Sequence, residues 1–414
     1  MNERNRVMYG IFLLAAVVGV YAEMDHSGSF SGKPVPAPSG SGKNATGPAA
    51  SSSGHTAPKT RPAAPIEVKN EIGTLDAELR AEFARSDDPW AVALSITVFA
   101  PGSDIVNQQR PVQSLLTFAS QTIKTKEWVF PVKEGTRFVQ RYPDALVAML
   151  LEARVPGHMK IETADGPAVM GDIWAPALLR RIGTKKHPWT SSAWTFKAQA
   201  FRAHDPAVAA DQNLRRSLDA LASQALSSLE SAAAVLTRFT GGSSGDADTL
   251  EAAQKNHKGI YAHSEGGYPL LQAVFHAVAD SRDKALIKQA RRQLGVLMFR
   301  IEAERDLHHS QIAKAESETL PDRIAALVLQ AGALETITLG QRLLSRPKEQ
   351  KDGTSRLTHA ADLLAHSLLA NLVALRAGRA FDIVYDERQK KAPYLDLLEA
   401  RCRALRGLRL LSAR

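Results

Sequence analysis

The stretch Leu214–Phe239, LRRSLDALASQALSSLESAAAVLTRF, decides the fold class. Its apolar side chains recur every three or four positions, as Leu214, Leu218, Leu221, Ala225, Leu229 and Ala232. Because an α-helix has 3.6 residues per turn, this spacing places them on one helical face. A Gly/Ser-rich run at 241–245 then predicts the end of the helix. We therefore predict a long amphipathic helix that packs on neighbouring helices.

The same periodicity recurs on both sides of this stretch. Toward the C-terminus we predict helices over Asp283–His308, from TLPDRI through Ile337, from Ser355 through Leu375, and over the final run PYLDLLEARCRALRGLRLL. Toward the N-terminus we predict helices in YPDALVAMLLEARVP, MGDIWAPALLRRIG and SSAWTFKAQAFRAHD. Pro143 suits the first position of the earliest of these. Successive helices of this kind pack as antiparallel hairpins, which predicts an all-α fold.

Residues 66–140 form a less regular N-terminal part, which we expect to be helical or mixed and to pack on a main helical domain, 141–414. LDAELRAEFARS predicts a short helix, and VQSLLTFASQTIKTKEWVF (112–130) also shows helical spacing. WAVALSITVFAPG (90–102) suits either a strand or a buried helix, because its apolar run is short and rich in β-branched residues.

The N-terminus indicates export. Arg4 and Arg6 precede an apolar run, Val7–Ala22, with small residues before Glu23. Residues 1–22 therefore predict a signal peptide or an uncleaved membrane anchor. Residues 23–65 are rich in Ser, Gly, Pro and Ala and predict a disordered linker, because they offer little apolar surface to bury. Either arrangement predicts a cell-envelope location, periplasmic or otherwise outside the cytoplasm.

Composition excludes several functional classes. The net charge of +9 is spread along 414 residues and is not interleaved with aromatic residues, which argues against nucleic-acid binding. The single cysteine, Cys402, permits no internal disulfide and no cysteine zinc site, and we expect it to be a small packing residue. No glycine-rich phosphate loop and no Gly-x-Ser-x-Gly elbow occurs, so the sequence indicates no cofactor and no serine hydrolase.

Four segments together resemble a known group of proteins. In order, YPDALVAMLLEARVP, ADGPAVMGDIWAPALL, WTFKAQAFRAH and AHSEGGYPLLQAVFHAV are similar to a group of uncharacterised bacterial exported proteins, over about residues 141–388. That group resembles the six-hairpin α/α toroids, the architecture of terpene cyclases and several polysaccharide lyases. The resemblance implies a toroid here. The chain has no aspartate-rich cyclase motif, which argues against terpene chemistry.

The resemblance also draws attention to the stretch YAHSEGGYPLL (261–271). In alginate-lyase-like toroids a Tyr, a His and an Asn abstract and return a proton beside a uronate carboxylate. The corresponding candidates here are Tyr261, His263 and Asn256, and Arg388 is a fourth. Candidate binding residues are Glu265, Gly266 and Gly267 at the turn, together with Tyr385 and Asp386 from the Tyr-Asp-Glu-Arg run.

Two other interpretations of this stretch stay open. The glycines can simply separate two helices, with Glu265 near a helix N-terminus and His263 a polar loop residue. A zinc site of His257, His263 and Glu265 has suitable ligands but no characteristic spacing, and we predict no metal. Among the other histidines, His276 and His366 face away from apolar stripes, whereas His308 falls on one and is expected to be partly buried.

These observations predict an exported or membrane-tethered helical domain that binds an envelope polymer or a protein partner without catalysis. The alternative is a toroid enzyme, of the lyase type, that acts on an acidic polysaccharide. Clustering of Tyr261, His263 and Arg388 around an open groove would favour the enzyme. Burial of His263 against the backbone would favour the binding domain.

Overall fold

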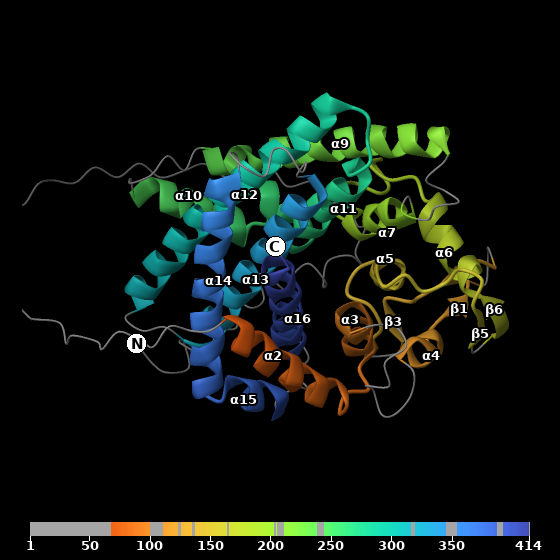
Figure 1. Cartoon of the computed structure of the whole chain (residues 1–414), viewed down its shortest axis with the longest axis horizontal. Coiled ribbons are helices and arrows are strands. Elements are labelled where there is room, and N and C mark those ends of the chain that lie inside the picture. The colour runs from red at the N-terminus through yellow and green to blue at the C-terminus, as the bar shows by residue number, and fades with distance from the viewer. Residues whose placement is uncertain are drawn as a thin grey trace, which may run out of the picture.

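The computed structural model describes residues 68–99, 111–122, 126–134, 137–163, 165–202, 204, 211–237, 244–315, 319–344, 354–386 and 392–413. About 75% of the structure is helical, and its few strands are short (Figure 1). The prediction of an all-α protein is therefore confirmed. The signal or anchor and the linker predicted for residues 1–65 lie outside the described residues.

Six helices form the interior and are called the inner helices. They are α3 (Pro89–Phe99), α5 (Ala145–Glu152), α7 (Ala193–Arg202), α11 (Tyr268–Val278), α13 (Leu320–Leu344) and α16 (Ala392–Ser412). Each packs on the next in this order, and α16 also packs on α3. Every residue of α11 is buried, as are most residues of α3, α5 and α7. Such helices have little or no solvent face, so their polar side chains must find partners inside the protein.

Five further helices of the described chain cover the inner ones. They are α2 (Val68–Phe83), α6 (Met170–Leu179), α9 (Gln212–Thr237), α12 (Lys284–Ala315) and α14 (Thr354–Ala377). Helix α2 packs on α16, α6 on α7, α9 on α11, and both α12 and α14 on α13. Inner and covering helices thus alternate along much of the chain. Helices α10 (Ser244–Lys255) and α15 (Ala380–Asp386) lie at the periphery (Figure 1).

The helix predicted for the segment 112–130 is wrong over most of its length. Helix α4 covers only Pro111–Leu116, and a two-stranded hairpin follows, β1 (Ser120–Gln121) with β2 (Trp128–Val129). Trp128 and Phe130 are buried, whereas Val129 between them is only half-buried. This alternation has the two-residue period of a strand, and it overrides the helical spacing of the preceding leucines.

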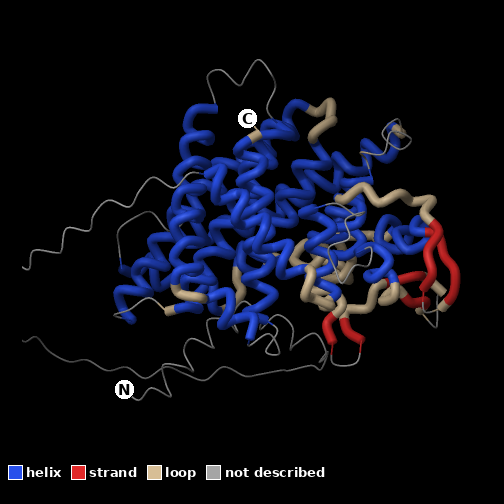
Figure 2. Tube along the Cα trace, turned by 60° about the horizontal axis from the view of Figure 1, so that its bottom comes forward, coloured by secondary structure: helices blue, strands red, loops and turns tan. Residues whose placement is uncertain are grey.

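Two further hairpins stand beside this one, all at one end of the molecule (Figure 2). They pair β3 (Lys133–Glu134) with β4 (Arg137–Phe138) and β5 (Lys160–Thr163) with β6 (Gly166–Val169). Hairpins this short add little independent stability, so the helices determine the fold.

The ambiguous segment WAVALSITVFAPG forms the inner helix α3, and its start explains why. The Asp88 carboxylate accepts hydrogen bonds from the backbone amides of Trp90 (2.9 Å) and Ala91 (3.4 Å). Pro89 supplies a fixed φ at the first helical position. These two residues start a helix despite the β-branched content that follows.

Arginines of α14 and α16 hold α2, the first described helix. Arg376 of α14 pairs with Glu78 (2.6 Å) and Glu71 (3.1 Å) of α2. Arg401 of α16 pairs with Glu82, which is buried. The beginning and the end of the described chain are therefore fixed to each other.

Two described helices, α13 and α14, are long and apolar enough to cross a membrane by length and composition alone. The apolar window of α13 is 72% buried inside the protein. Since the core helix of a globular domain has the same property, this observation gives weak evidence for a membrane span.

Candidate functional site

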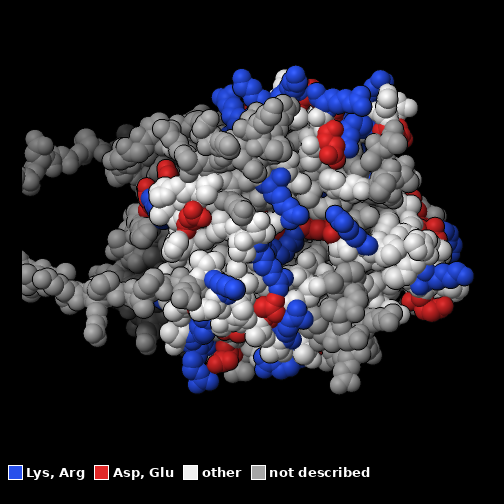
Figure 3. Space-filling view, viewed as in Figure 1, with Lys and Arg blue, Asp and Glu red and all other residues white. Residues whose placement is uncertain are grey.

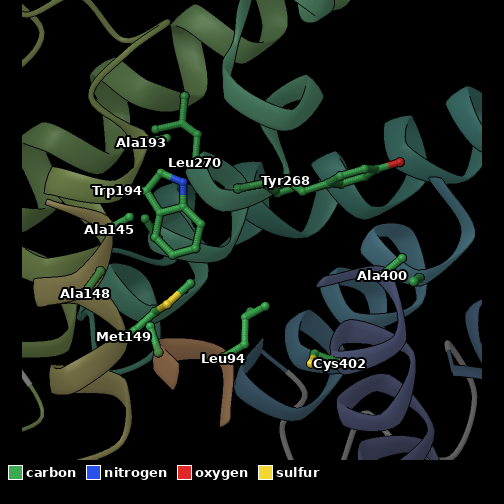
Figure 4. Close-up of a cluster of buried hydrophobic side chains, with 14 of the residues drawn as sticks. Leu94, Ala145, Ala148, Met149, Ala193, Trp194, Tyr268, Leu270, Ala400 and Cys402 are labelled. Atoms are coloured by element: carbon green, nitrogen blue, oxygen red, sulfur yellow. The ribbon is translucent and has the colours of Figure 1, made fainter. Parts of the chain in front are cut away.

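The six inner helices meet around charged side chains, which we call the central polar cluster. Its members are Glu152 of α5, Lys197 of α7, Gln272 of α11, Glu335 of α13, and Glu399, Arg403 and Arg406 of α16. Apolar side chains enclose it, and Figure 4 shows Leu94, Met149, Trp194 and Cys402 around the same space. The water-accessible space left among them is about 20 Å³, which is room for about one water molecule.

On one side of the cluster, Glu152 is held by two cations. Lys197 Nζ lies 3.1 Å from Glu152 Oε2 and donates a 3.0 Å hydrogen bond to Gln272 Oε1. Arg406 pairs with Glu152 and, at 3.1 Å, with Glu335. Burial alone would raise the pKa of Glu152, but Arg406 and then Lys197 lower it to about 2. Glu152 is thus a permanent anion that joins three helices.

On the other side, Arg403 lies between two carboxyl groups. It pairs with Glu265 and with Glu399, the latter at 2.6 Å. Glu399 also accepts from Arg141 at 3.0 Å, and Arg141 pairs with Asp396 at 2.5 Å. Burial raises the pKa of Glu265 to about 7, because the opposing effect of Arg403 is offset by repulsion from Glu399. This raised pKa predicts that Glu265, beside the central polar cluster, exchanges a proton near neutral pH.

The turn that contains Glu265 has an unusual backbone. Glu265 has φ 50°, Gly266 has φ 63° and Gly267 has φ 86°, all left-handed. Arg300 of α12 donates to the Gly266 carbonyl, and a Cβ at Gly266 would lie 2.4 Å from Arg300 Nη2. Of these two glycines, both predicted as binding residues, Gly266 leaves room for Arg300, and Gly267 leaves room for Ile260 and Leu229. The turn directs Glu265 inward.

The three proposed proton-transfer residues have separate partners. His263 is 4% exposed, and it is hydrogen-bonded to the Trp189 backbone. Tyr261 is half-buried under the Arg300 guanidinium, 5.5 Å from its ring centroid. Asn256 is exposed and donates to the carbonyl of Ala252 on its own helix, at 2.7 Å.

The ionisation of these side chains follows from their burial. Burial lowers the pKa of His263, and Arg300 lowers it further, against the effect of the Trp189 backbone. Burial and then the Glu304 carboxylate raise the pKa of Tyr261 above its ordinary value. A neutral imidazole and a neutral phenol result at neutral pH.

The Tyr-Asp-Glu-Arg run lies elsewhere. Tyr385 of α15 is half-buried, with Arg85 4.7 Å above its ring and Tyr394 5.9 Å away. Asp386 is the last residue of α15, and Arg388 lies outside the described residues. Helix α15 packs on α14 and α16, at the opposite side of the molecule from α11 in Figure 1. The structure therefore does not bring Tyr385 together with Tyr261 and His263.

Two of the three side chains considered as zinc ligands, His263 and Glu265, have different partners. His263 is buried with the Trp189 backbone, and Glu265 is paired with Arg403. Within the described part of the chain, no group of three or more His, Cys, Asp or Glu side chains could hold a metal ion.

The prediction that His276 faces solvent is wrong. His276 is buried on α11, and its Nδ1 lies 3.2 Å from Nε2 of His204. Burial lowers its pKa to about 3. The helical-face argument fails because α11 has no exposed face. His308, as predicted, is partly buried, with a ring nitrogen 3.0 Å from the Asp322 carbonyl.

Sequence reasoning also missed the central polar cluster. Its main contributor is α16, whose run LEARCRALR suggests a basic, solvated helix. Arg401 and Arg403 are nevertheless buried. A signal was present, since charged residues occur on several faces of a helix that also contains seven leucines in 21 residues. Cys402 is buried as expected, and burial raises its pKa.

The geometry defines a class, an all-α protein whose inner helices enclose paired charges. The chain matches no known protein family, no curated protein and no solved structure among those compared with it.

Proposed function

We propose that this chain is a non-catalytic helical binding domain of the cell envelope, which engages an envelope polymer or a protein partner. In this proposal residues 1–22 act as a signal or a membrane anchor, and residues 23–65 act as the tether. The domain then works in the periplasm or outside the cell. The sequence pattern of these 65 residues supports this location.

The proposal includes an α/α toroid for the helical domain. Two facts support it: the inner helices contact one another in a cycle from α3 to α16 and back to α3, and covering helices alternate with them along much of the chain. In a toroid the centre is the usual place for a ligand site, so the contents of that centre bear directly on function.

The observation that carries the proposal is that this centre is filled. Charged pairs occupy it and leave about 20 Å³. A second cavity, beside Gly266 and Gly267, has about 30 Å³ and mostly apolar walls. Ligand pockets have roughly 300–1,000 Å³, so neither cavity admits a sugar ring. Binding therefore occurs on the outer surface.

The lyase alternative requires a shared open groove for its acid and base. His263 instead has the Trp189 backbone as its partner, and Asn256 points back to Ala252. Burial of His263 against the backbone is the arrangement expected for a binding domain.

The test is to incubate the full purified chain with acidic polysaccharides and isolated cell-wall polymers. Co-sedimentation measures binding, and the absorbance of unsaturated uronates with the appearance of reducing ends measures cleavage. We expect binding to at least one envelope polymer or purified envelope protein, with no cleavage. Cleavage that is lost in His263→Ala, while its folded fraction is unchanged, would establish the enzyme instead.

A further inference from the structure

The exposed face of α12 carries an ordered set of residues, which we call the α12 stripe. It consists of Lys284, Lys288, Arg292, Gly295 and Phe299, all of them exposed. At 3.6 residues per turn they fall within an arc of about 80°, along about 22 Å of helix. The stripe is therefore a single straight line of side chains on a covering helix.

The cations of the α12 stripe are not balanced within the described chain. Residues 284–300 contain five basic and no acidic residues. The ion pairs of α12 lie further along, at Arg300–Glu304 and Arg305–Asp306. The nearest carboxylate in sequence, Asp283, accepts hydrogen bonds from the backbone amides of Ala285 and Leu286 at the helix start.

This arrangement works against the helix that carries it. Like charges four residues apart repel, and cations near a helix N-terminus oppose its dipole, each at a cost of a few tenths of a kcal/mol. Lys284, Lys288 and Arg292 stand four residues apart, and Lys284 also lies in the first turn of α12. A charge pattern that destabilises its own helix, and that no contact inside the fold offsets, is expected at a site that binds another molecule. In Figure 3 basic side chains gather along the upper edge, where α12 begins in Figure 1.

The other end of the stripe has a different chemistry. Phe299 is 41% exposed, one of few large apolar side chains on the described surface. A Cβ on Gly295 would have no atom within 4 Å. The helix surface between Arg292 and the phenyl ring is therefore a shallow depression. An exposed aromatic ring beside a shallow step suits the flat apolar face of a sugar ring. The neighbouring cations suit carboxylate or sulfate groups.

We propose that the α12 stripe binds an acidic polysaccharide, with its anionic groups along Lys284, Lys288 and Arg292 and a sugar ring on Phe299. This inference rests on the proposed function and specifies its partner. A single row of cations matches a linear charged chain, whereas a membrane surface requires a broad apolar face. Glu302, the next carboxylate on this face, limits the site beyond Phe299 by repulsion.

The experiment measures the affinity of the full chain for polygalacturonate by isothermal titration. The first variant, Lys284→Gln with Lys288→Gln and Arg292→Gln, removes the cations, and the second, Phe299→Ala, removes the ring. The control, Arg181→Gln with Lys185→Gln and Lys186→Gln, removes three charges from an exposed loop. Neutral dextran and vesicles of phosphatidylglycerol are the comparison ligands.

We expect the first variant to lose affinity at least about tenfold and Phe299→Ala at least about twofold. The control should bind as the native chain does, and dextran should not bind. Thermal unfolding should show the first variant at least as stable as the native chain, because repulsion is removed.

Equal losses of affinity in the first variant and the control would overturn the proposal that the α12 stripe is the binding site. The attraction would then depend only on net charge. Vesicle binding that exceeds polymer binding, with both sensitive to the stripe, would overturn the polysaccharide as its ligand. If the polymer or a purified envelope protein binds equally to all variants, the proposed binding site on the α12 stripe is wrong. The proposal of a binding domain would still hold. Cleavage of the polymer would instead contradict the proposed function itself.

Discussion

Glu265 occupies a left-handed backbone position, and its carboxyl group reaches Arg403 of α16. The stretch that suggested an active-site loop thus supplies a buried acid to the interior. Its composition, Tyr, His, Glu and two glycines, is explained by this inward turn. Gly266 accepts the approach of Arg300, and His263 satisfies the backbone of Trp189.

The raised pKa of Glu265 predicts a pH-dependent stability. Between its ordinary value near 4.5 and about 7, the folded chain keeps a proton that the unfolded chain has lost. The free energy of unfolding therefore falls as pH rises through this window. Glu265→Gln removes this effect, so its melting temperature should rise relative to the native chain from about pH 5 to about pH 8.

Differential scanning calorimetry of both proteins across this pH range measures the difference between their melting temperatures. The contributions of His276 and the other titrating groups cancel in this difference, because both proteins contain them. A constant or falling difference would show that Glu265 is ionised throughout, as a simple partner of Arg403.

His263 provides a second prediction at the residue scale. Because it is buried and hydrogen-bonded to the backbone, His263→Ala should reduce the free energy of unfolding by about 1–3 kcal/mol. The matched control, His359→Ala, changes an exposed residue of α14 and should lie within about 0.5 kcal/mol of the native value. Urea unfolding checks both. If His263→Ala is as stable as the native chain, the role of His263 is not structural and it is again a candidate functional residue.

At the scale of elements, α16 is the helix on which the interior depends. Its arginines pair with carboxylates from α2, α5, α13 and the turn before α11. Arg403→Met should cost about 3–5 kcal/mol, because it leaves Glu265 buried without its cation and leaves Glu399 with Arg141 alone. Adding Glu265→Gln should restore part of this loss.

Arg305→Met is the control for Arg403→Met. Arg305 and its partner Asp306 have side chains 59% and 60% exposed, so the pair contributes little. Urea unfolding of the three variants gives the comparison. A cost of less than about 1 kcal/mol for Arg403→Met would mean that apolar packing, not the paired charges, holds α16.

Most helices could be predicted from apolar spacing, and the failures have physical causes. Helices α9, α12 and α14 each have one apolar face and one solvent face, which is the pattern that periodicity detects. The inner α3 has no solvent face, and only Asp88 and Pro89 distinguish it from a strand. Helix α5 begins two residues after Pro143, because Asp144 takes a left-handed φ of 62° and accepts hydrogen bonds from Thr195 and Arg180.

At the scale of the whole molecule, the candidate site could be predicted only in part. The composition of the stretch 261–271 marks it as unusual, but its partners cannot be predicted, since Arg300, Glu304 and Arg403 are far along the chain. The central polar cluster combines residues from five helices that span Glu152 to Arg406. No local pattern contains that information, because each charged residue alone is typical of a solvated helix.

Hydrogen–deuterium exchange of the full chain tests most directly whether α16 unites the inner helices into one unit. We expect amides of α3, α5, α7, α11, α13 and α16 to exchange last and with one common rate, and Arg403→Met to accelerate all six together. Exchange in which α16 is released while α7 and α11 keep their native protection would contradict a single charged interior.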